Sequence, residues 1–283
     1  MSAPPEELQR GTSSVVIARH LRSDIEAGRY RHQQQLPSTR KLADEWQTSV
    51  ATINRAMAQL ANEGLVINRA RSSRVVNYPG PDERPSNQQT TPTVVLIGGY
   101  PGSGKTELAR ILTRLTGWPI LDKDSTTRPV VEAALAQLGL SPHDRESEMY
   151  LSVIRPAEYE GLRTTTAENV ECGNSAIVSA PFIRELGDAA WCRRITADID
   201  AMDAQLRTVW VRCDPDSMRT YLIRRGAARD AYKLAHWADY VAGLDLEFTP
   251  AMPHAIIENS LSSTPLQHQA EELLRTWGVK KTR

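Results

Sequence analysis

The feature that most constrains this chain is a glycine-rich loop placed between an apolar strand and a helix. Four consecutive apolar residues, Val94 to Ile97, predict a strand that is buried on both faces of a sheet. The sequence GGYPGSGKT follows, and from Gly99 it fits the pattern GxxxxGK[ST] of the Walker A loop. We expect a helix beyond it, over Glu107 to Leu115, with its positive N-terminus directed at the loop. The pattern predicts an α/β P-loop fold and nucleoside triphosphate binding.

Each position of this loop has an expected part in holding ATP and Mg²⁺. The glycines allow backbone N–H groups to turn toward the β-phosphate. Lys105 is expected to reach the β- and γ-phosphates, and the Thr106 hydroxyl to ligate Mg²⁺. The expected cofactor site comprises Gly99, Tyr100, Pro101, Gly102, Ser103, Gly104, Lys105 and Thr106. A chance glycine-rich turn would not explain a Lys-Thr pair at the correct offset.

Further apolar runs separated by helical stretches predict a parallel sheet with helices on both faces. The expected strands are Trp118–Leu121, Ser175–Ser179, Thr208–Cys213 and His254–Glu258. In an open α/β sheet the carboxyl ends of the strands face the ligand. Side chains that follow these strands are therefore candidates for the site.

One strand ends in the sequence LDKD, which places two acids at that edge of the sheet. Asp124 there can accept a proton from an acceptor hydroxyl or help to hold Mg²⁺, and Asp122 is a second candidate for contacting the substrate. Alternatively, Asp124 caps the helix that begins near Ser125.

Arginines toward the C-terminal side predict a lid over the phosphates. Arg225 and Arg229 are four residues apart on one helical face, and Gly226-Ala227-Ala228 between them suits a flexible lid base. A solvated helix face is the alternative interpretation. Asp214 follows an apolar strand, but because Pro215 comes next we expect it to cap a helix rather than to act as a Walker B acid. The sequence therefore disfavours a motor ATPase.

The acceptor site is expected between the second and third strands, over residues 125–174. This segment is rich in charged and aromatic side chains, namely Arg128, Glu132, Arg145, Glu146, Tyr150, Arg155, Glu158 and Tyr159. Arg128 and Arg155 are the first candidates for binding an unidentified small molecule. Amphipathic surface helices would explain any single one of these residues equally well.

This combination resembles the family of small P-loop kinases that includes zeta toxins, chloramphenicol phosphotransferase and the kinase domain of phage polynucleotide kinase. The shared features are GG-x-PGSGKT, the acid in LDKD and R-x-x-x-R in the lid. The resemblance implies Lys105 and Thr106 for ATP and Mg²⁺, Asp124 as base, and Arg225 and Arg229 as lid arginines. It also implies that Asn259 lines the adenine pocket, where a plain turn over residues 258–260 is the alternative.

The first block of the chain has another pattern. Apolar residues at helical spacing predict three helices, the first ending at Gly28 and the others capped by Ser38 and Ser49. Their expected apolar positions are Val15, Ala18, Leu21 and Ile25, then Leu42, Ala43 and Trp46, then Ile53, Ala56, Met57 and Leu60. Short β-rich runs over 65–67 and 75–76 surround a basic tip. Two helices with a tight turn and a following hairpin predict a winged helix-turn-helix.

The third helix would bury one face and offer the other to the major groove of DNA. The offered face carries Thr52, Asn54 and Arg55, and Ser49 at its N-terminus suits a phosphate. Arg40 and the wing residues Arg71 and Arg74 suit phosphate or minor-groove contacts. A solvated helical bundle with ordinary surface arginines is the alternative.

The stretch LPSTRKLADEWQTSVATINRAMAQLANEGLV resembles the GntR-type winged-helix family of bacterial regulators. The shared pattern is LPS-x-R-x-LA, then S-x-x-T-[VI]-x-x-A-[ML]-x-x-L, then EGL[VI]. The resemblance implies contacts with a double-stranded DNA operator through Arg40, Ser49, Thr52, Asn54 and Arg55. We expect the regulator to bind this operator as a homodimer. The wing departs from the family pattern, because Arg71-Ser72-Ser73 stand where the family usually has glycines.

The charge distribution agrees with this division of the chain. The 34 basic and 34 acidic residues balance, which by itself argues against a nucleic-acid binder. Residues 1–78, however, hold 11 basic and 7 acidic residues, and the remainder holds 23 basic and 27 acidic ones. The proline-rich run NYPGPDERPSNQQTTPT predicts a linker. The expected organisation is a winged helix over 1–78, a linker over 79–93 and a P-loop domain over 94–283.

A cytoplasmic location is expected. The N-terminal sequence MSAPPEELQRGTSS lacks the apolar core of a signal peptide, and no apolar run approaches the roughly 18 residues that span a bilayer. The three cysteines, Cys172, Cys192 and Cys213, are too scattered for a disulfide framework or a metal site.

Two functional hypotheses follow. The first is a transcriptional regulator whose kinase-like domain senses ATP together with a metabolite. The second is an active small-molecule or nucleic-acid kinase, an ATP-dependent phosphotransferase whose winged helix localises or regulates it.

Overall fold

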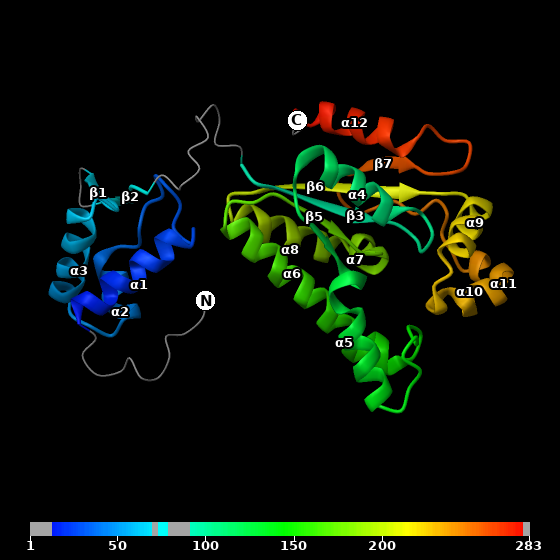
Figure 1. Cartoon of the computed structure of the whole chain (residues 1–283), viewed down its shortest axis with the longest axis horizontal. Coiled ribbons are helices and arrows are strands. Elements are labelled where there is room, and N and C mark those ends of the chain that lie inside the picture. Colours follow the sequence, from blue (N-terminus) through cyan, green and yellow to red (C-terminus); the bar gives the residue numbers. More distant parts are fainter. Residues whose placement is uncertain (1–12, 70–72, 79–90, 280–283) are drawn as a thin grey trace. The chain divides into compact units, whose positions relative to one another are not determined.

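Two separate units make up the computed structural model, which describes residues 13–69, 73–78 and 91–279 (Figure 1). The second unit contains residues 91–170 and 174–283, and the winged-helix pattern falls in the first. Most of the expected linker, residues 79–90, lies outside the described residues. No helix in the described ranges is long and apolar enough to cross a membrane.

The first unit is a winged helix-turn-helix, as the sequence predicts. Its helices are α1 (Ser14–Glu26), α2 (Thr39–Glu45) and α3 (Val50–Asn62), followed by the antiparallel strands β1 (Val66–Arg69) and β2 (Ser73–Val76). Both predicted caps are confirmed. The Ser38 hydroxyl accepts from the Lys41 N–H at 3.2 Å, and the Ser49 hydroxyl accepts from the Thr52 N–H at 3.1 Å. These caps fix where α2 and α3 begin.

The core of this unit lies between the three helices and the hairpin. Its fully buried side chains include Ile17, Leu21, Ile53 and Leu60. The prediction for Val15 was wrong, because that side chain lies in the first turn of α1 and is 62% exposed. The buried stripe of α1 instead runs through Ile17, Ala18, Leu21 and Ile25, which share one face of the helix.

The second unit is built on a parallel sheet of five strands in the order β4-β5-β3-β6-β7. The strands are β3 (Thr93–Gly98), β4 (Ile120–Asp122), β5 (Ala176–Ser179), β6 (Gln205–Arg212) and β7 (Ala255–Glu258). Each pairing is parallel, with β3 in the centre between β5 and β6. This confirms the predicted α/β fold, and all five strands fall at the expected places.

Helices cover both faces of this sheet. On one face, Val95 and Ile97 pack against α4 (Lys105–Thr116) and α12 (Leu266–Thr276). On the other, Val94 and Leu96 pack against α6 (Arg155–Glu171), α7 (Ile183–Gly187) and α8 (Ala189–Asp200). Successive residues of β3 point to opposite faces and all are buried, which explains its unbroken apolar sequence.

Two groups of helices extend beyond the carboxyl ends of the strands (Figure 1). The first is α5 (Lys123–Gln137), with the π-helix η3 (Tyr150–Ile154) that leads into α6. The second is α9 (Pro215–Arg225), η4 (Ala228–Asp230), α10 (Ala231–Ala235) and α11 (Trp237–Ala242). The α9 helix begins as predicted, since the Asp214 carboxylate accepts from the Ser217 N–H at 2.8 Å.

Candidate functional site

The Walker A loop joins β3 to α4 through glycines that allow an unusually close approach of the chain. Gly104, directly before α4, has a φ of 96°, and a Cβ there would lie 2.1 Å from the Asn259 Nδ2 atom. Gly99 also has a positive φ, and a Cβ there would lie 2.6 Å from the Ser103 hydroxyl oxygen. These two positions therefore have no room for a side chain, and glycine allows the loop to turn tightly there, as a phosphate-binding loop requires.

Polar groups of this loop fit an anionic ligand. Lys105 Nζ donates to the Tyr100 carbonyl oxygen at 2.9 Å, and Asn259 Nδ2 donates to the Ser103 carbonyl oxygen at 2.9 Å. The Ser103 hydroxyl is buried and has no hydrogen-bond partner among the described residues. An orphaned buried hydroxyl calls for a ligand that supplies the missing contact. Asn259 contacts the loop itself, and its expected contact with adenine stays a prediction.

Asp122 lies at the end of β4, and its carboxylate contacts two neighbouring residues. One carboxylate oxygen accepts from the Ser125 N–H at 3.0 Å and caps α5, while the other lies 3.4 Å from the Thr106 hydroxyl oxygen. The alternative in which Asp124 caps this helix was wrong, because α5 begins at Lys123 and its N-cap is Asp122. The acid beside the Walker A threonine is therefore Asp122. A hydroxyl and a carboxylate are hard oxygen ligands of the kind that Mg²⁺ prefers.

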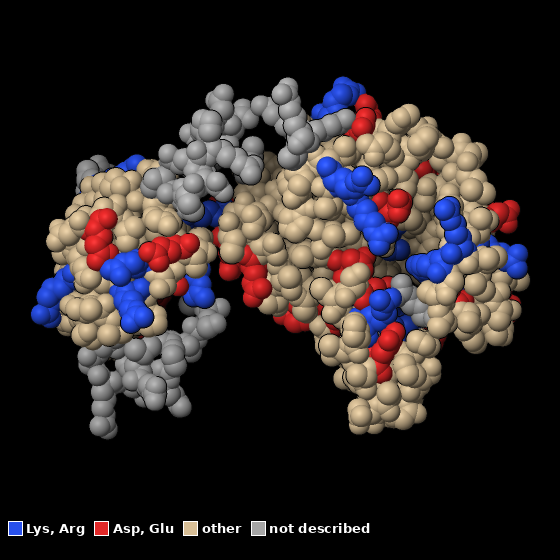
Figure 2. Space-filling view, in the orientation of Figure 1, with Lys and Arg blue, Asp and Glu red and all other residues tan. Residues whose placement is uncertain are grey.

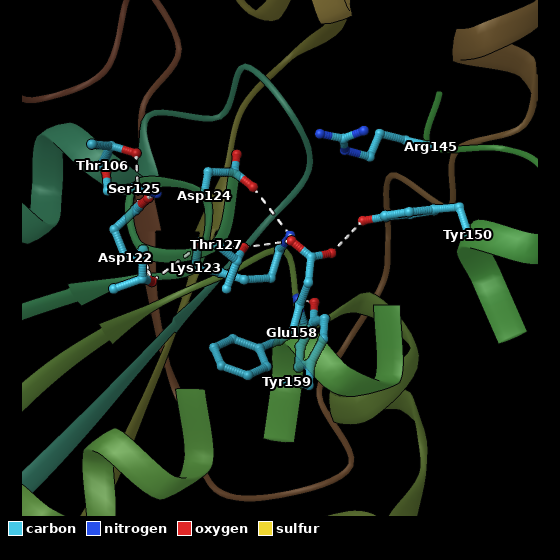
Figure 3. Close-up of polar contacts among 12 residues, drawn as sticks. Thr106, Asp122, Lys123, Asp124, Ser125, Thr127, Arg145, Tyr150, Glu158 and Tyr159 are labelled. Carbon is cyan, nitrogen blue, oxygen red and sulfur yellow. Dashed lines mark hydrogen bonds and ion pairs between the residues drawn. The ribbon is translucent and has the colours of Figure 1, made fainter. Parts of the chain in front are cut away.

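Asp124, two residues further along the chain, is held by a buried polar network (Figure 3). Lys123 Nζ lies 3.1 Å from an Asp124 carboxylate oxygen and 2.8 Å from Glu158 Oε1. Glu158 Oε1 also accepts from the Thr127 hydroxyl at 2.6 Å, and Glu158 Oε2 from the Tyr150 hydroxyl at 2.7 Å. Lys123 and Glu158 are 4% exposed, whereas the Asp124 side chain is 40% exposed. The network thus holds a solvent-facing carboxylate with a buried ion pair.

Tyr150 keeps its proton in this network. Burial, together with the Glu158 carboxylate that accepts its hydrogen bond, raises the pKa of the Tyr150 hydroxyl far above its ordinary value. It is therefore a hydrogen-bond donor throughout the physiological range. Its position in the π-helix η3 is notable because π-helical turns occur often at functional sites.

The expected lid follows α9. Arg225 donates from Nε and Nη2 to one Asp230 carboxylate oxygen, at 2.9 and 2.6 Å, and Asp230 is buried. Gly226 ends α9 in the left-handed conformation, with a φ of 61°. The backbone of Arg229 lies in η4, but its side chain is outside the described part of the structure. Arg225 therefore stabilises the turn between α9 and α10 by its bonds to Asp230. The lid role of both arginines stays a prediction.

The two arginines proposed for the acceptor differ in their surroundings. Arg128 is exposed on α5, one turn after Asp124, and its guanidinium makes no hydrogen bond or ion pair with the described residues. Arg155 forms two bonds with the Glu185 carboxylate, at 2.7 and 2.9 Å, and lies over the Tyr159 ring. Because its charge is neutralised within the protein, Arg155 is better explained by packing, and its acceptor role stays an untested prediction.

Basic side chains gather at this end of the unit. Figure 2 shows Lys and Arg around a hollow between the part that carries α5 and the part that carries α9 to α11, with acidic side chains among them. One ion pair, between Lys233 of α10 and Glu146, joins the two parts at 3.2 Å. The segment that follows α5 and the helices that follow α9 are therefore in contact at one point.

The winged helix presents the expected residues at its surface. Arg40, Asn54 and Arg55 are exposed, and Thr52 is half-buried with its hydroxyl 2.8 Å from that of Ser49. Arg74 of the wing donates to the Thr39 hydroxyl at 2.7 Å and to the Asn54 side-chain oxygen at 2.9 Å, so it joins β2 to both helices. The expected Arg71 contact falls outside the described residues. The DNA contacts of all these residues stay predictions.

The sequence alone does not indicate that Lys123, Tyr150 and Glu158 form the network that holds Asp124. Glu158 and Tyr150 belong to the segment that is expected to bind the acceptor, and Lys123 lies between two aspartates with no role predicted for it. One signal was available, because Glu158 occupies the same stripe of α6 as the buried residues Leu162, Thr166 and Val170, four residues apart. A carboxylate on such a stripe requires a buried partner.

Two family models match the chain. Residues 14–76 match the family described as bacterial regulatory proteins, gntR family, and residues 94–246 match the family described as AAA domain. A search of the curated proteins found no significant match.

Solved structures similar to this chain include three kinases. A putative kinase from Chloroflexus aurantiacus j-10-fl is 18% identical, with a TM-score of 0.45 over 66% of this chain and 98% of that chain. A sugar kinase from Janibacter sp. HTCC2649 is 17% identical, with a TM-score of 0.45 over 67% and 95%. The APS kinase of Mycobacterium tuberculosis, solved with AMPPNP and APS, is 17% identical, with a TM-score of 0.41 over 66% and 98%.

The AAA domain match spans more than half of the chain and coincides with the P-loop geometry described above. The gntR match coincides with the winged helix. This chain therefore belongs to the AAA domain family, with a kinase-like P-loop unit that is preceded by a gntR-family DNA-binding domain.

Proposed function

We propose that this protein is a DNA-binding transcriptional regulator whose P-loop domain binds ATP and a small hydroxylated molecule and transfers the γ-phosphoryl group to it. The observation that carries this proposal is a pair of acids at the end of β4, one of which contacts the Walker A loop. Asp122 contacts Thr106, and Asp124 faces solvent at the same edge of the sheet. Asp124 therefore supplies an accessible carboxylate of the kind that can accept a proton during phosphoryl transfer.

In the proposed reaction, Asp124 accepts the proton of the acceptor hydroxyl. Lys105 and the N–H groups of the Walker A loop hold the phosphates, while Arg225 and Arg229 close over them from the lid side. Thr106 and Asp122 would hold Mg²⁺, which supplies positive charge to the phosphates when bound. Asp124, which the sequence also offers as a ligand of this ion, is given the role of base here. Phosphoryl transfer depends mainly on positioning and charge, which these residues can provide.

Nucleotide binding tests the first half of this proposal. Lys105→Ala should abolish binding of AMPPNP in calorimetry, because the variant removes the cation that faces the β- and γ-phosphates. Arg110→Ala, on the same helix α4 and outside the loop, serves as the control. Unchanged affinity in Lys105→Ala would refute the phosphate-binding role of this loop.

Phosphoryl transfer tests the second half. Wild-type protein with ATP and Mg²⁺ should transfer phosphate to a member of a pool of sugars, nucleosides or polynucleotides. Asp124→Asn should abolish transfer and preserve AMPPNP binding, since the change removes the base and keeps the shape. If no phosphate is transferred to any pool, the phosphotransferase proposal is refuted, and a domain that only senses ATP and a metabolite becomes the better explanation.

The winged helix is proposed to bind a double-stranded operator as a cytoplasmic homodimer. Arg40→Ala and Arg55→Ala should each weaken operator binding, and loss of a phosphate contact by Arg40 should reduce the salt slope by about 0.9. Arg19→Ala, an exposed arginine of α1, is the matched control. The reading of DNA by α3 is refuted if neither variant differs from this control. Sedimentation with and without operator DNA tests the dimer.

Coupling of the two units requires a difference in affinity. ATP or the acceptor can change operator binding only if it binds one arrangement of the winged helices more tightly than another. Operator affinity measured with and without AMPPNP tests this coupling, and equal values would leave the P-loop domain as an independent enzyme. The domain limits 1–78, 79–93 and 94–283 remain part of the proposal.

A further inference from the structure

Arg145 is a fixed cation that lacks a carboxylate partner in the described parts of the chain. Its Nη1 atom donates to the carbonyl oxygens of Pro142 and Asp144, at 3.1 and 2.6 Å, and its guanidinium carbon lies 5.2 Å from the centre of the Tyr150 ring. The Asp144 carboxylate is directed elsewhere, because it accepts from the N–H groups of Glu146 and Ser147. The contacts of Arg145 thus fix its orientation and leave its charge uncompensated.

Two other arginines of the P-loop unit have their positive charge neutralised by a carboxylate. Arg155 is paired with Glu185, and Arg225 with Asp230, each at 2.6 to 2.9 Å. Arg128 resembles Arg145 instead, since it has no charged partner among the described residues. Two uncompensated guanidiniums therefore belong to the segment in which the acceptor is expected.

A single buried carboxylate positions both Arg145 and the proposed base. Glu158 accepts from the Tyr150 hydroxyl, which places the ring that Arg145 covers. The same Glu158 holds Lys123, which in turn holds Asp124. Figure 3 shows Asp124 and Arg145 on the same side of this network. The charges of Asp124 and Arg145 also act in opposite senses on the pKa of the one Tyr150 hydroxyl, which agrees with their common surroundings.

We propose that Arg145 binds an anionic group of the acceptor while Asp124 receives the proton of its hydroxyl, so that the substrate is a small alcohol bearing a carboxylate or a phosphate. This inference rests on the proposed phosphotransferase function. In the reaction, the acceptor oxygen forms a bond to the γ-phosphorus of ATP as the bond from that phosphorus to the β,γ-bridging oxygen breaks, and this oxygen leaves with ADP. The proton of the acceptor hydroxyl passes to the Asp124 carboxylate.

Discrimination against neutral alcohols follows from the same geometry. When the acceptor and the lid exclude water, a neutral acceptor would leave the Arg145 guanidinium desolvated with carbonyl contacts alone. An anionic acceptor supplies the missing charge. Sites built around a polar group reject ligands that fail to pair it much more strongly than apolar pockets reject a change of size.

Sulfate binding to the full-length protein saturated with AMPPNP and Mg²⁺ tests this inference, because the nucleotide then fills the Walker A loop. By equilibrium dialysis with labelled sulfate, Arg145→Gln should weaken the affinity about tenfold, the amount expected for a lost hydrogen bond between charged groups. Arg145→Lys should retain part of the affinity. Arg163→Gln, which removes an exposed arginine of α6, should match wild type. Thermal unfolding of each variant checks that it is folded.

Matched acceptors form the second arm. Acceptor-dependent ADP formation is compared for glucose with gluconate, and for ribose with ribose 5-phosphate, which separates carboxylate from phosphate. Turnover of an anionic member with little turnover of its neutral partner supports the inference, and equal turnover within a pair overturns it. So does equal sulfate affinity, or equal lack of it, in wild type and Arg145→Gln. Failure of AMPPNP to bind would instead refute the proposed function.

Discussion

Glu158 should be the residue of the P-loop unit whose charge is least dispensable for folding. Its side chain is 3% exposed, and its carboxylate lies 2.8 Å from Nζ of Lys123, whose side chain is 5% exposed. The change Glu158→Gln keeps the shape of the side chain and removes the negative charge. Lys123 would then retain Asp124 as its counter-charge, at 3.1 Å and at a more exposed position.

Removing one partner of a buried ion pair costs about 3–5 kcal/mol. Because Asp124 still compensates Lys123 in part, we expect the lower end of this range, about 3 kcal/mol. A loss of that size is a large part of the roughly 5–15 kcal/mol that stabilise a domain. The double variant Lys123→Met/Glu158→Gln removes both charges and should recover at least half of the loss, since the buried cation is then gone.

Urea unfolding followed by tryptophan fluorescence measures the effect, because Trp210 is buried in the sheet of this unit. Glu160→Gln is the matched control on the same helix. It breaks an ion pair with Arg163 in which both side chains are at least half exposed, and it should cost at most about 1 kcal/mol. A loss for Glu158→Gln no larger than that of the control would refute the assignment of a buried charge network.

Three further predictions test other parts of the unit. Gly104→Ala should weaken AMPPNP binding at least about tenfold, because its Cβ would collide with Asn259. Gly139→Ala is the control, since Gly139 also has a positive φ but open space around it, and it should leave the affinity unchanged. Equal affinities of the two variants in calorimetry would contradict the packing of the loop. Asp214→Ala should cost about 1 kcal/mol through loss of the α9 cap. Hydrogen bonds from Ser217 and Ser260 lower the pKa of Asp214 to about 2, below its ordinary value of 3.8. The stability difference between wild type and Asp214→Ala is therefore complete above pH 3.8 and should disappear as the pH falls from 4 toward 2. A difference in thermal unfolding that stays constant with pH would refute this. Arg155→Ala should destabilise the unit by about 3 kcal/mol, since Glu185 stays buried without its partner, and should leave sulfate binding intact; loss of sulfate binding in the folded variant would return Arg155 to the acceptor site.

Local sequence patterns were sufficient for most of the fold. Ser38 and Ser49 cap their helices as expected because an N-cap depends on a side chain and an N–H group three residues away. The strands of the sheet appear as apolar runs because both of their faces are covered. Val15 failed for the complementary reason, since spacing alone does not say which turn of a helix is covered by its neighbours.

The site was predictable where function resides in contiguous residues and not where it depends on pairing across the chain. The Walker A loop is a local arrangement of backbone, so GGYPGSGKT was enough to place Lys105 and Thr106 beside β3. It was not possible to predict which acid, Asp122 or Asp124, lies beside the Thr106 hydroxyl, because this depends on how β4 and the Walker A loop pack together. Arg128 and Arg155 look alike in sequence, yet a carboxylate 30 residues from Arg155 neutralises one of them.

The sequence by itself determined that this chain joins a winged helix to a P-loop unit, because caps, periodicity and a glycine-rich loop act over a few residues. Only the tertiary structure decided that Glu158 links Lys123 and Tyr150, and so sets the positions of both Asp124 and Arg145. The physical reason is that the charge balance of a buried group is a sum over neighbours that the fold brings together from distant segments.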